Sequence, residues 1–333
     1  MQVRFWGVRG SCPAPTSGDD ISWRLTEALS RLGCVGPALN LDELLSNRAA
    51  IEAWVAALPL GIRGTVGGNT PCVEMRTADG ELFIIDLGTG VRALGTELMG
   101  SEFGQGRGHA HIFLSHYHWD HIQGWPFFKP AYIPGNRLEV YARHAKLASH
   151  LRQQQEAPFF PPASWDDMGA SIAYHEIDGQ PLSLCDGRVR VQSIELDHPS
   201  RAYAYRFEAD GKVFVYASDG SYQGCRDDAA LKPFVEFFRD ADLLIFDAQF
   251  TLSESFEKRT WGHSSAVIGV ELACSAGVRN LALFHHDPGA DDATLEHLLQ
   301  VGQQYALLVP GVERRRPDEC QLFLAREGLT VDL

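Results

Sequence analysis

A run of six residues at positions 116–121, His-Tyr-His-Trp-Asp-His, constrains this chain more than any other feature. It places four potential metal ligands directly after an apolar stretch that predicts a buried strand. His116 and His118 stand two residues apart, so an extended strand end points both to one side. The chain then turns, and Asp120 and His121 can face a second position. One segment therefore predicts ligands for two adjacent ions.

Further candidate ligands follow three predicted strands in the second half of the chain, namely His198, Asp219 and His285. Loops at one edge of layered sheets gather the residues that end their strands. A lone histidine after a strand is more often a hydrogen-bonded loop residue, so these candidates depend on the 116–121 run. His286 is an alternative to its neighbour. Imidazole and carboxylate ligands suit zinc, and also manganese or iron.

The pattern of predicted elements favours two mixed sheets with helices outside them. Strands dominate the first half of the chain, and strands alternate with helices in the second. The first eight residues predict an edge strand. Residues 17–62 interrupt this pattern with apolar side chains near helical spacing, so two or three helices are expected there as an insertion. Its role is left open between shaping the substrate pocket and forming a dimer contact.

Length and composition exclude several classes of protein. The 333 residues, with 45% hydrophobic and 22% charged, are typical of a globular chain rather than a disordered or coiled-coil one. No run approaches about 18 apolar residues, so no membrane span is expected. The N-terminus lacks a signal-peptide core, and the seven cysteines form no C-x-x-C pair. We therefore expect a cytoplasmic protein with reduced thiols.

The net charge of −14 argues against a long nucleic-acid footprint. Phosphate binding needs Lys and Arg to displace counterions, and an acidic chain repels nucleic acid in bulk. A local cationic centre such as a metal site can still attract a small anion.

These residues together carry a family resemblance. The H-x-H-x-D-H signature of metallo-β-lactamase-fold hydrolases is matched in full within 116–121, and Asp86 matches the aspartate that ends an early strand of that family. The opening at 5–11 and the Gly-Gly-Asn-Thr-Pro-Cys segment at 67–72 resemble one branch of it. That branch includes the phosphonate-pathway cyclic phosphodiesterase and is related to the tRNA 3′-end processing endonucleases. The resemblance covers nearly all of the chain except the insertion.

The resemblance implies an α+β fold, a four-layer αββα sandwich forming one domain over 1–333 with the helical insertion at 17–62. It implies one ion held by His116, His118 and His198. It implies a second ion held by Asp120, His121 and His285, and it favours His285 over His286. Asp219 would bridge the ions, and Asp86 would orient the cluster loop without binding metal. Many true β-lactamases of this fold have cysteine at the bridging position, whereas an all-oxygen-and-nitrogen site better suits two-metal ester or phosphoester hydrolysis.

A histidine and an aspartate outside the ligand set are candidates for acid catalysis. Gly262-His263-Ser264 resembles a segment of the phosphodiesterase relatives, and Asp247 resembles the acidic position that accompanies it. A histidine held by a carboxylate can protonate a leaving alkoxide near neutral pH. The alternative is structural, since Ser264 or Ser265 would then cap the following helix and Asp247 would be a satisfied strand-end carboxylate.

The favoured function is hydrolysis of a small cyclic or linear phosphodiester through a hydroxide that bridges two divalent ions. Carboxyl-ester, lactone or thioester hydrolysis on the same ions is the first alternative, because one fold hosts many activities. A non-catalytic metal-binding sensor or interaction module is the second. A homodimer is the default expectation for a soluble oligomer, although no feature here demands it.

Two further groups of side chains carry weaker signals. A set of aromatic residues could stack a base or hold an acyl chain, although aromatics more often fill a core. These residues are Trp119, Trp125, Phe127, Phe128, Phe159 and Phe160. Six histidines show no partner pattern and are interpreted as ordinary surface or strand residues. They are His109, His111, His144, His150, His175 and His297.

Overall fold

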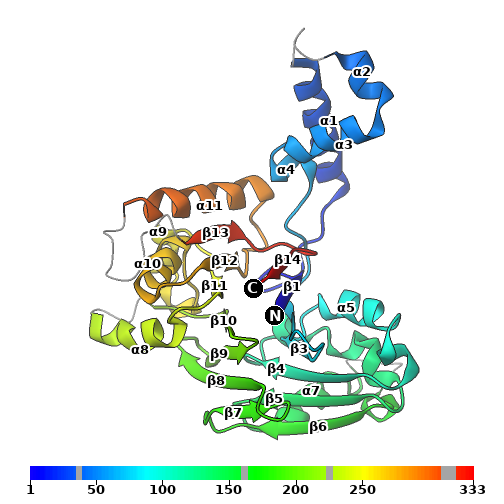
Figure 1. The fold of residues 1–333 in the computed structure, drawn as a ribbon, viewed down its shortest axis with the longest axis vertical. Coiled ribbons are helices and arrows are strands. Elements are labelled where there is room, and N and C mark those ends of the chain that lie inside the picture. The colour runs from blue at the N-terminus through cyan, green and yellow to red at the C-terminus, as the bar shows by residue number, and fades with distance from the viewer. Residues whose placement is uncertain (35–39, 159–163, 223–227, 309–319) are drawn as a thin grey trace.

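A computed structural model describes residues 1–34, 40–158, 164–222, 228–308 and 320–333. Two seven-stranded mixed sheets form its centre (Figure 1). The first has the order β14-β1-β2-β3-β4-β5-β6, and the second has the order β13-β12-β11-β10-β9-β8-β7. In each sheet four neighbouring strands pair antiparallel and the remaining three extend the sheet in parallel. The predicted pair of mixed sheets is thereby confirmed.

The strands of the first sheet are β1 (Gln2–Gly7), β2 (Cys72–Arg76), β3 (Leu82–Ile85), β4 (His109–Leu114), β5 (Arg137–Ala142), β6 (Ser171–Glu176) and β14 (Thr330–Asp332). Those of the second are β7 (Leu182–Leu184), β8 (Val189–Leu196), β9 (Ala202–Ala209), β10 (Lys212–Ala217), β11 (Leu243–Asp247), β12 (Asn280–Phe284) and β13 (Gln321–Leu324). The helices are α1 (Gly18–Cys34), α2 (Leu41–Ser46), α3 (Arg48–Ala57), α4 (Leu60–Arg63), α5 (Val91–Leu98), α6 (Trp119–Ile122), α7 (Leu147–Gln153), α8 (Asp228–Phe238), α9 (Leu252–Glu257), α10 (Ala266–Ala276) and α11 (Asp292–Ala306).

Alternation along the strands builds two separate apolar cores. Phe83 and Phe113 point between the sheets, where Phe113 meets Tyr205 of the second sheet with ring centroids 5.2 Å apart. Their neighbours Ile84 and Ile112 point the other way, toward α5 and α7. Since side chains of a strand alternate between its two faces, each central strand of the first sheet serves both cores. The result is helix, sheet, sheet and helix in four layers.

The secondary structure expected from the sequence needs two corrections. β1 is an inner strand and not an edge strand, because β14 pairs with its outer side and β2 with its inner side. The short strands β6, β7 and β14 and the helices α5, α6 and α9 were not predicted. β14 has only three residues, and it is recognisable as a strand only through its pairing with a segment more than 300 residues away.

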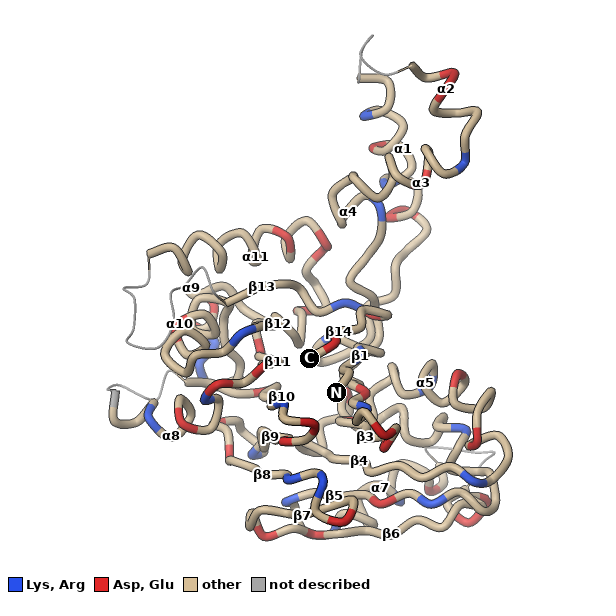
Figure 2. The backbone as a smooth tube through the Cα atoms, in the orientation of Figure 1, with Lys and Arg blue, Asp and Glu red and all other residues tan. Residues whose placement is uncertain are grey.

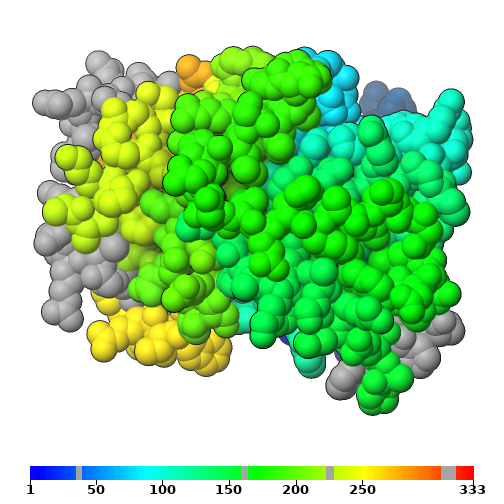
Figure 3. All heavy atoms as spheres, turned by 90° about the horizontal axis from the view of Figure 1, so that it is seen from below, coloured from blue at the N-terminus to red at the C-terminus, as the bar shows by residue number. Residues whose placement is uncertain are grey.

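The inserted helices α1 to α4 form an arm that projects from the two sheets (Figure 1). From below, the surface is made mostly of the green and yellow segments, and the blue arm is almost entirely hidden (Figure 3). No residue of α1 or α3 is buried. Two or three helices were predicted between 17 and 62, and the described residues of this segment contain four. Within the described ranges, no helix has the length and apolar character needed to cross a bilayer.

A buried carboxylate joins the base of the arm to α11. Asp292 is 4% exposed, and its oxygens lie 2.5 Å from Arg24 Nη2 and 2.9 Å from the Val66 amide nitrogen. Arg9 Nη2 lies 3.9 Å away. Buried charges require such partners, because desolvation of an unpaired charge is costly.

Replacing Asp292 with alanine is expected to lower the free energy of unfolding by about 3–5 kcal/mol, because it leaves buried cationic and amide groups without their partner. Urea denaturation followed by circular dichroism measures the change. Glu97→Ala is the matched control, because Glu97 pairs with Arg4 at the surface and should cost less than about 1 kcal/mol. Equal losses in both variants would contradict the assignment of Asp292 as a structural anchor.

Candidate metal centre

The candidate ligands converge where strands of both sheets end. The 116–121 segment follows β4 and continues into α6, while His198 follows β8, Asp219 follows β10 and His285 follows β12. Residues almost 170 positions apart thus meet at one edge, as expected for loops that end layered strands.

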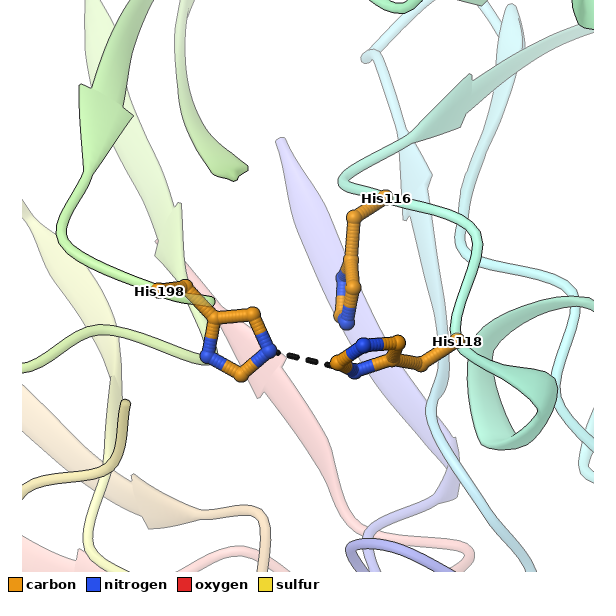
Figure 4. Close-up of side chains that lie close together, drawn as sticks. All are labelled: His116, His118 and His198. Atoms are coloured by element: carbon orange, nitrogen blue, oxygen red, sulfur yellow. Dashed lines mark hydrogen bonds between the residues drawn. The ribbon is translucent and has the colours of Figure 1, made fainter. Parts of the chain in front are cut away.

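Three histidines form the first group. Donor nitrogens of His116, His118 and His198 all lie within 4.8 Å of one another, and the rings point toward a common centre (Figure 4). His198 Nε2 is 3.1 Å from His118 Nδ1. His116 Nε2 is buried and has no hydrogen-bond partner among the described residues. A buried nitrogen without a partner is costly unless something else, such as an ion, fills that place.

Two carboxylates and two histidines form the second group. Asp120, His121, Asp219 and His285 also place their donor atoms within 4.8 Å of one another. Asp219 Oδ2 is 3.1 Å from His121 Nε2, and its Oδ1 is 3.2 Å from His285 Nε2. The same Oδ1 is 3.8 Å from His116 Nε2. Asp219 therefore stands between the two groups.

The donor set fits divalent cations. Burial alone would lower the pKa of His121, but the surrounding carboxylates, above all that of Asp219, raise its pKa well above the usual range. Burial lowers the pKa of His116 and of His198. The neutral imidazoles of His116 and His198, together with the negative charge gathered around His121, form an environment of the kind that holds zinc, manganese or iron.

Four histidines have one nitrogen occupied by a protein partner and the other turned inward. His121 Nδ1 is 2.8 Å from Asp86 Oδ2, His198 Nδ1 is 3.0 Å from the Gly262 carbonyl oxygen, and His285 Nδ1 is 3.0 Å from Gln249 Oε1. His116 Nδ1 is 3.0 Å from Ser115 Oγ. Metal-ligating histidines are oriented by such partners, which fix the ring and its tautomer.

Asp86 holds the loop that carries the cluster. Its carboxylate is fully buried and accepts hydrogen bonds from the Ser115 amide at 2.7 Å and the Ser115 hydroxyl at 2.8 Å. It also accepts one from the Tyr216 hydroxyl at 2.7 Å. With the bond to His121, four contacts join the ends of β3, β4 and β10.

Several strand-end residues have left-handed backbone. Asp86, Asp219 and His285 have φ values of +61°, +58° and +58°. Residues other than glycine seldom adopt this region, and they cluster at functional sites when the surroundings hold them there. Gly10 allows His285 this position, because a Cβ at residue 10 would lie 2.4 Å from the His285 Nδ1 atom.

His285 and His286 have different surroundings. His285 Nε2 lies 3.2 Å from Asp120 Oδ2 and faces the cluster. His286 is buried, but its Nε2 lies 2.8 Å from the Ala325 carbonyl oxygen and the ring is directed elsewhere. Burial lowers the pKa of His286 to about 4. The geometry therefore brings His285, and not its neighbour, to the candidate ligand set.

His263 stands beside the second group and is held by Asp247. Its Nδ1 is 2.7 Å from Asp247 Oδ2, and its ring stacks on that of His285 with centroids 4.9 Å apart. Burial would lower the pKa of His263, but Asp247 outweighs this effect and raises the pKa to about 9. The side chain of Ser265 accepts from the Ile268 amide and caps α10, so the capping role and the His263–Asp247 pair coexist.

A cavity of about 470 Å³ opens over the cluster. It is lined by Ser11, Tyr117, His118, Trp119, Asp120, His198, Asp219, Trp261, His263 and His285. Ser11 and Trp261 were not among the predicted site residues, nor was Gln249, which contacts His285. A serine in a Gly-Pro-rich loop and a single tryptophan carry no spacing signal. Only their position in the fold reveals them.

The predicted aromatic rim is only partly at the surface. Trp119 is 83% exposed beside the cavity and Phe127 is 50% exposed. Trp125 and Phe128 are fully buried in the outer core of the first sheet. The remaining two, at 159–160, lie outside the described residues.

Comparison with known proteins agrees with this geometry. A family model described as the beta-lactamase superfamily domain matches residues 83–286, which is more than half of the chain. Ribonuclease Z of Haloferax volcanii is 26% identical over 287 residues, covering 72% of this chain and 84% of that protein.

Solved structures show the same fold. The metallo-beta-lactamase fold protein YhfI from Bacillus subtilis superposes with a TM-score of 0.59 at 17% identity, covering 99% of this chain and 98% of that one. The short form of human tRNase Z superposes with a TM-score of 0.58 at 16% identity, covering 100% and 99%.

Asp86→Asn is expected to weaken metal binding about 10–100-fold, because it removes the charge that orients His121 without removing a candidate ligand. Competition with a chromophoric chelator measures the affinity for Zn²⁺. Glu97→Gln, a surface carboxyl-to-amide change, should leave the affinity unaltered. Unchanged affinity in the Asp86 variant would show that this carboxylate acts only in folding.

Proposed function

Because the chain belongs to the beta-lactamase superfamily and is a metal-dependent hydrolase, we propose that it is a phosphodiesterase with two metal ions. Its substrate in this proposal is a small cyclic or linear phosphodiester. The observation that carries the proposal is His263, which lines the cavity and whose Nδ1 lies 2.7 Å from Asp247 Oδ2 behind it.

The proposed ligand sets follow the two clusters of donor atoms. His116, His118 and His198 would hold one ion, and Asp120, His121 and His285 the second. Asp219, which lies close to both groups, would bridge them. When bound, the ions would lower the pKa of a water and offset the charge that grows on the phosphoryl oxygens.

His263 is the proposed general acid. Its Nδ1 is engaged by Asp247, so Nε2 is the atom that can deliver a proton to a leaving alkoxide. An alkoxide is a poor leaving group and gains much from this proton, whereas a nitrophenolate leaves unaided. Asp247 keeps the ring oriented and stabilises its cationic form.

A small substrate is favoured by the cavity and by the charge. About 470 Å³ holds a mononucleotide-sized molecule and not a folded RNA. Lys and Arg are interspersed with Asp and Glu along the backbone (Figure 2), and the net charge is −14. A chain with this distribution of charges and this net charge lacks the run of cations that binding of a long phosphate backbone needs. Ribonuclease Z among the relatives makes RNA the competing substrate to test.

The first measurement compares hydrolysis of bis(p-nitrophenyl) phosphate with that of p-nitrophenyl acetate by the metal-reconstituted protein. We expect metal-dependent cleavage of the diester alone, with loss of at least about 100-fold in His118→Ala because a candidate ligand is removed. Cleavage of the acetate alone would favour carboxyl-ester, lactone or thioester hydrolysis. A precursor tRNA tested in parallel would identify a nuclease if it were cleaved faster than the small diester. Absence of turnover on every substrate would favour a binding module.

His263→Ala is expected to slow cleavage of an alkyl phosphodiester by about 10²–10⁴-fold, the usual contribution of general acid catalysis. Cleavage of the nitrophenyl diester should fall far less, because its leaving group needs no proton. Steady-state kcat/KM for the two substrates measures the difference. Asp247→Asn should show the same selectivity in weaker form. Equal losses on both leaving groups would remove the acid role from the mechanism.

A further inference from the structure

A second group of metal-ligating side chains lies away from the candidate centre. Donor atoms of Glu81, His111 and Cys185 all fall within 4.8 Å of one another. His111 and His116 belong to the same stretch of β4 and its end, five residues apart, which corresponds to roughly 16 Å along an extended strand. The group is therefore distinct from the cavity and shares no residue with it.

His111 lies in a strand, β4, which is one of the two places that the sequence suggested for it. Its side chain is buried, its ring stacks on Phe83 with centroids 4.9 Å apart, and its Nδ1 is 3.3 Å from the Tyr141 hydroxyl. The other nitrogen, Nε2, faces Cys185 Sγ at 3.7 Å. One nitrogen engaged by a partner and the other aimed at a potential site is the arrangement of a metal-ligating histidine.

Cys185 comes from the opposite sheet. It begins the turn between β7 and β8, where its backbone has φ +53° and its carbonyl oxygen accepts from Arg188 Nε at 2.9 Å. Glu81 directly precedes β3 of the first sheet, and its Oε1 lies 2.9 Å from Arg188 Nη2. Burial, with Glu81 adding to it, raises the pKa of the Cys185 thiol to about 11. A thiol in this state is protonated unless a cation replaces its proton.

We propose that Glu81, His111 and Cys185 bind a zinc ion that joins the two sheets at a distance from the cavity. A thiolate, an imidazole and a carboxylate are three of the four ligands of a tetrahedral zinc site, and solvent can supply the fourth because Glu81 and Cys185 are only half-buried. Binding replaces the thiol proton, which is released to solvent. The thiolate and the carboxylate then neutralise the two positive charges of the ion.

A thiolate ligand gives this site its own spectroscopic signature. The candidate ligands of the cavity are histidines and aspartates only. In the cobalt-substituted full-length protein, a near-ultraviolet sulfur-to-cobalt charge-transfer band therefore reports the Cys185 site, and the cavity contributes no such band. We expect this band in the unsubstituted chain, and at saturation its intensity should correspond to one thiolate-bound cobalt ion per chain, in addition to any cobalt held in the cavity.

Cys185→Ser should abolish the band and leave cobalt binding in the cavity intact. Cys12→Ser is the matched control, because Cys12 is an exposed thiol next to the cavity-lining Ser11, and it should keep the full band. Glu81→Gln should keep the band but require at least about 10-fold more cobalt to reach it, since a ligand charge is lost. This variant retains both the thiol and His111 and decides the matter if Cys185→Ser does not fold.

Three results would overturn the proposal. The first is absence of the band in the cobalt-loaded unsubstituted chain, which would identify the group as a hydrogen-bonded triad without metal. The second is persistence of the band in Cys185→Ser. The third is an unchanged cobalt requirement in Glu81→Gln. None of these outcomes depends on catalytic turnover, so failure here is distinguishable from failure of the proposed phosphodiesterase activity.

Discussion

The buried carboxylate of Asp86 is the contact on which the candidate centre depends. It ends β3 with a left-handed backbone and receives hydrogen bonds from the end of β4, from the cluster loop and from Tyr216 of the second sheet. A carboxylate out of contact with water is tolerable only when its oxygens are satisfied in this way. Because the donors belong to both sheets, the packing of the sheets and the placement of the ligands are coupled.

Much of this arrangement is readable in the sequence because local signals coincide there. The 116–121 run supplies several ligands at once, and its position after an apolar strand predicts the sheet edge at which it lies. His198, Asp219 and His285 each carry a weak signal, yet each follows a strand whose hydrophobic pattern is clear. The two mixed sheets follow from the same patterns, since strand periodicity is set by which face of each sheet is buried.

Features that depend on long-range pairing were not accessible in this way. β1 has the appearance of an edge strand until β14 is placed beside it. The three residues of β14 are too few to show a strand pattern that would predict this pairing. Gln249 and Trp261 reach the centre only because of how β11 and the loop before α10 are packed. Likewise, His111 and Cys185 stand 74 positions apart, and only the stacking of the two sheets brings them within 3.7 Å. Contacts between residues so far apart in the sequence leave no motif of fixed spacing by which they could be predicted.

The arm composed of α1 to α4 leaves and re-enters the first sheet at adjoining points. β1 and β2 pair as far as Gly7 opposite Cys72, with a register shift between Phe5 and Gly7, and the Val8 amide still bonds to the Asn69 carbonyl oxygen. The hairpin is thus closed below the arm, whatever the length of chain above it. Doubling a flexible connection costs only about 0.6 kcal/mol in closure entropy. The segment between β1 and β2 can consequently differ in length and structure between related chains without displacing the candidate ligands, because the pairing of β1 with β2 does not depend on it.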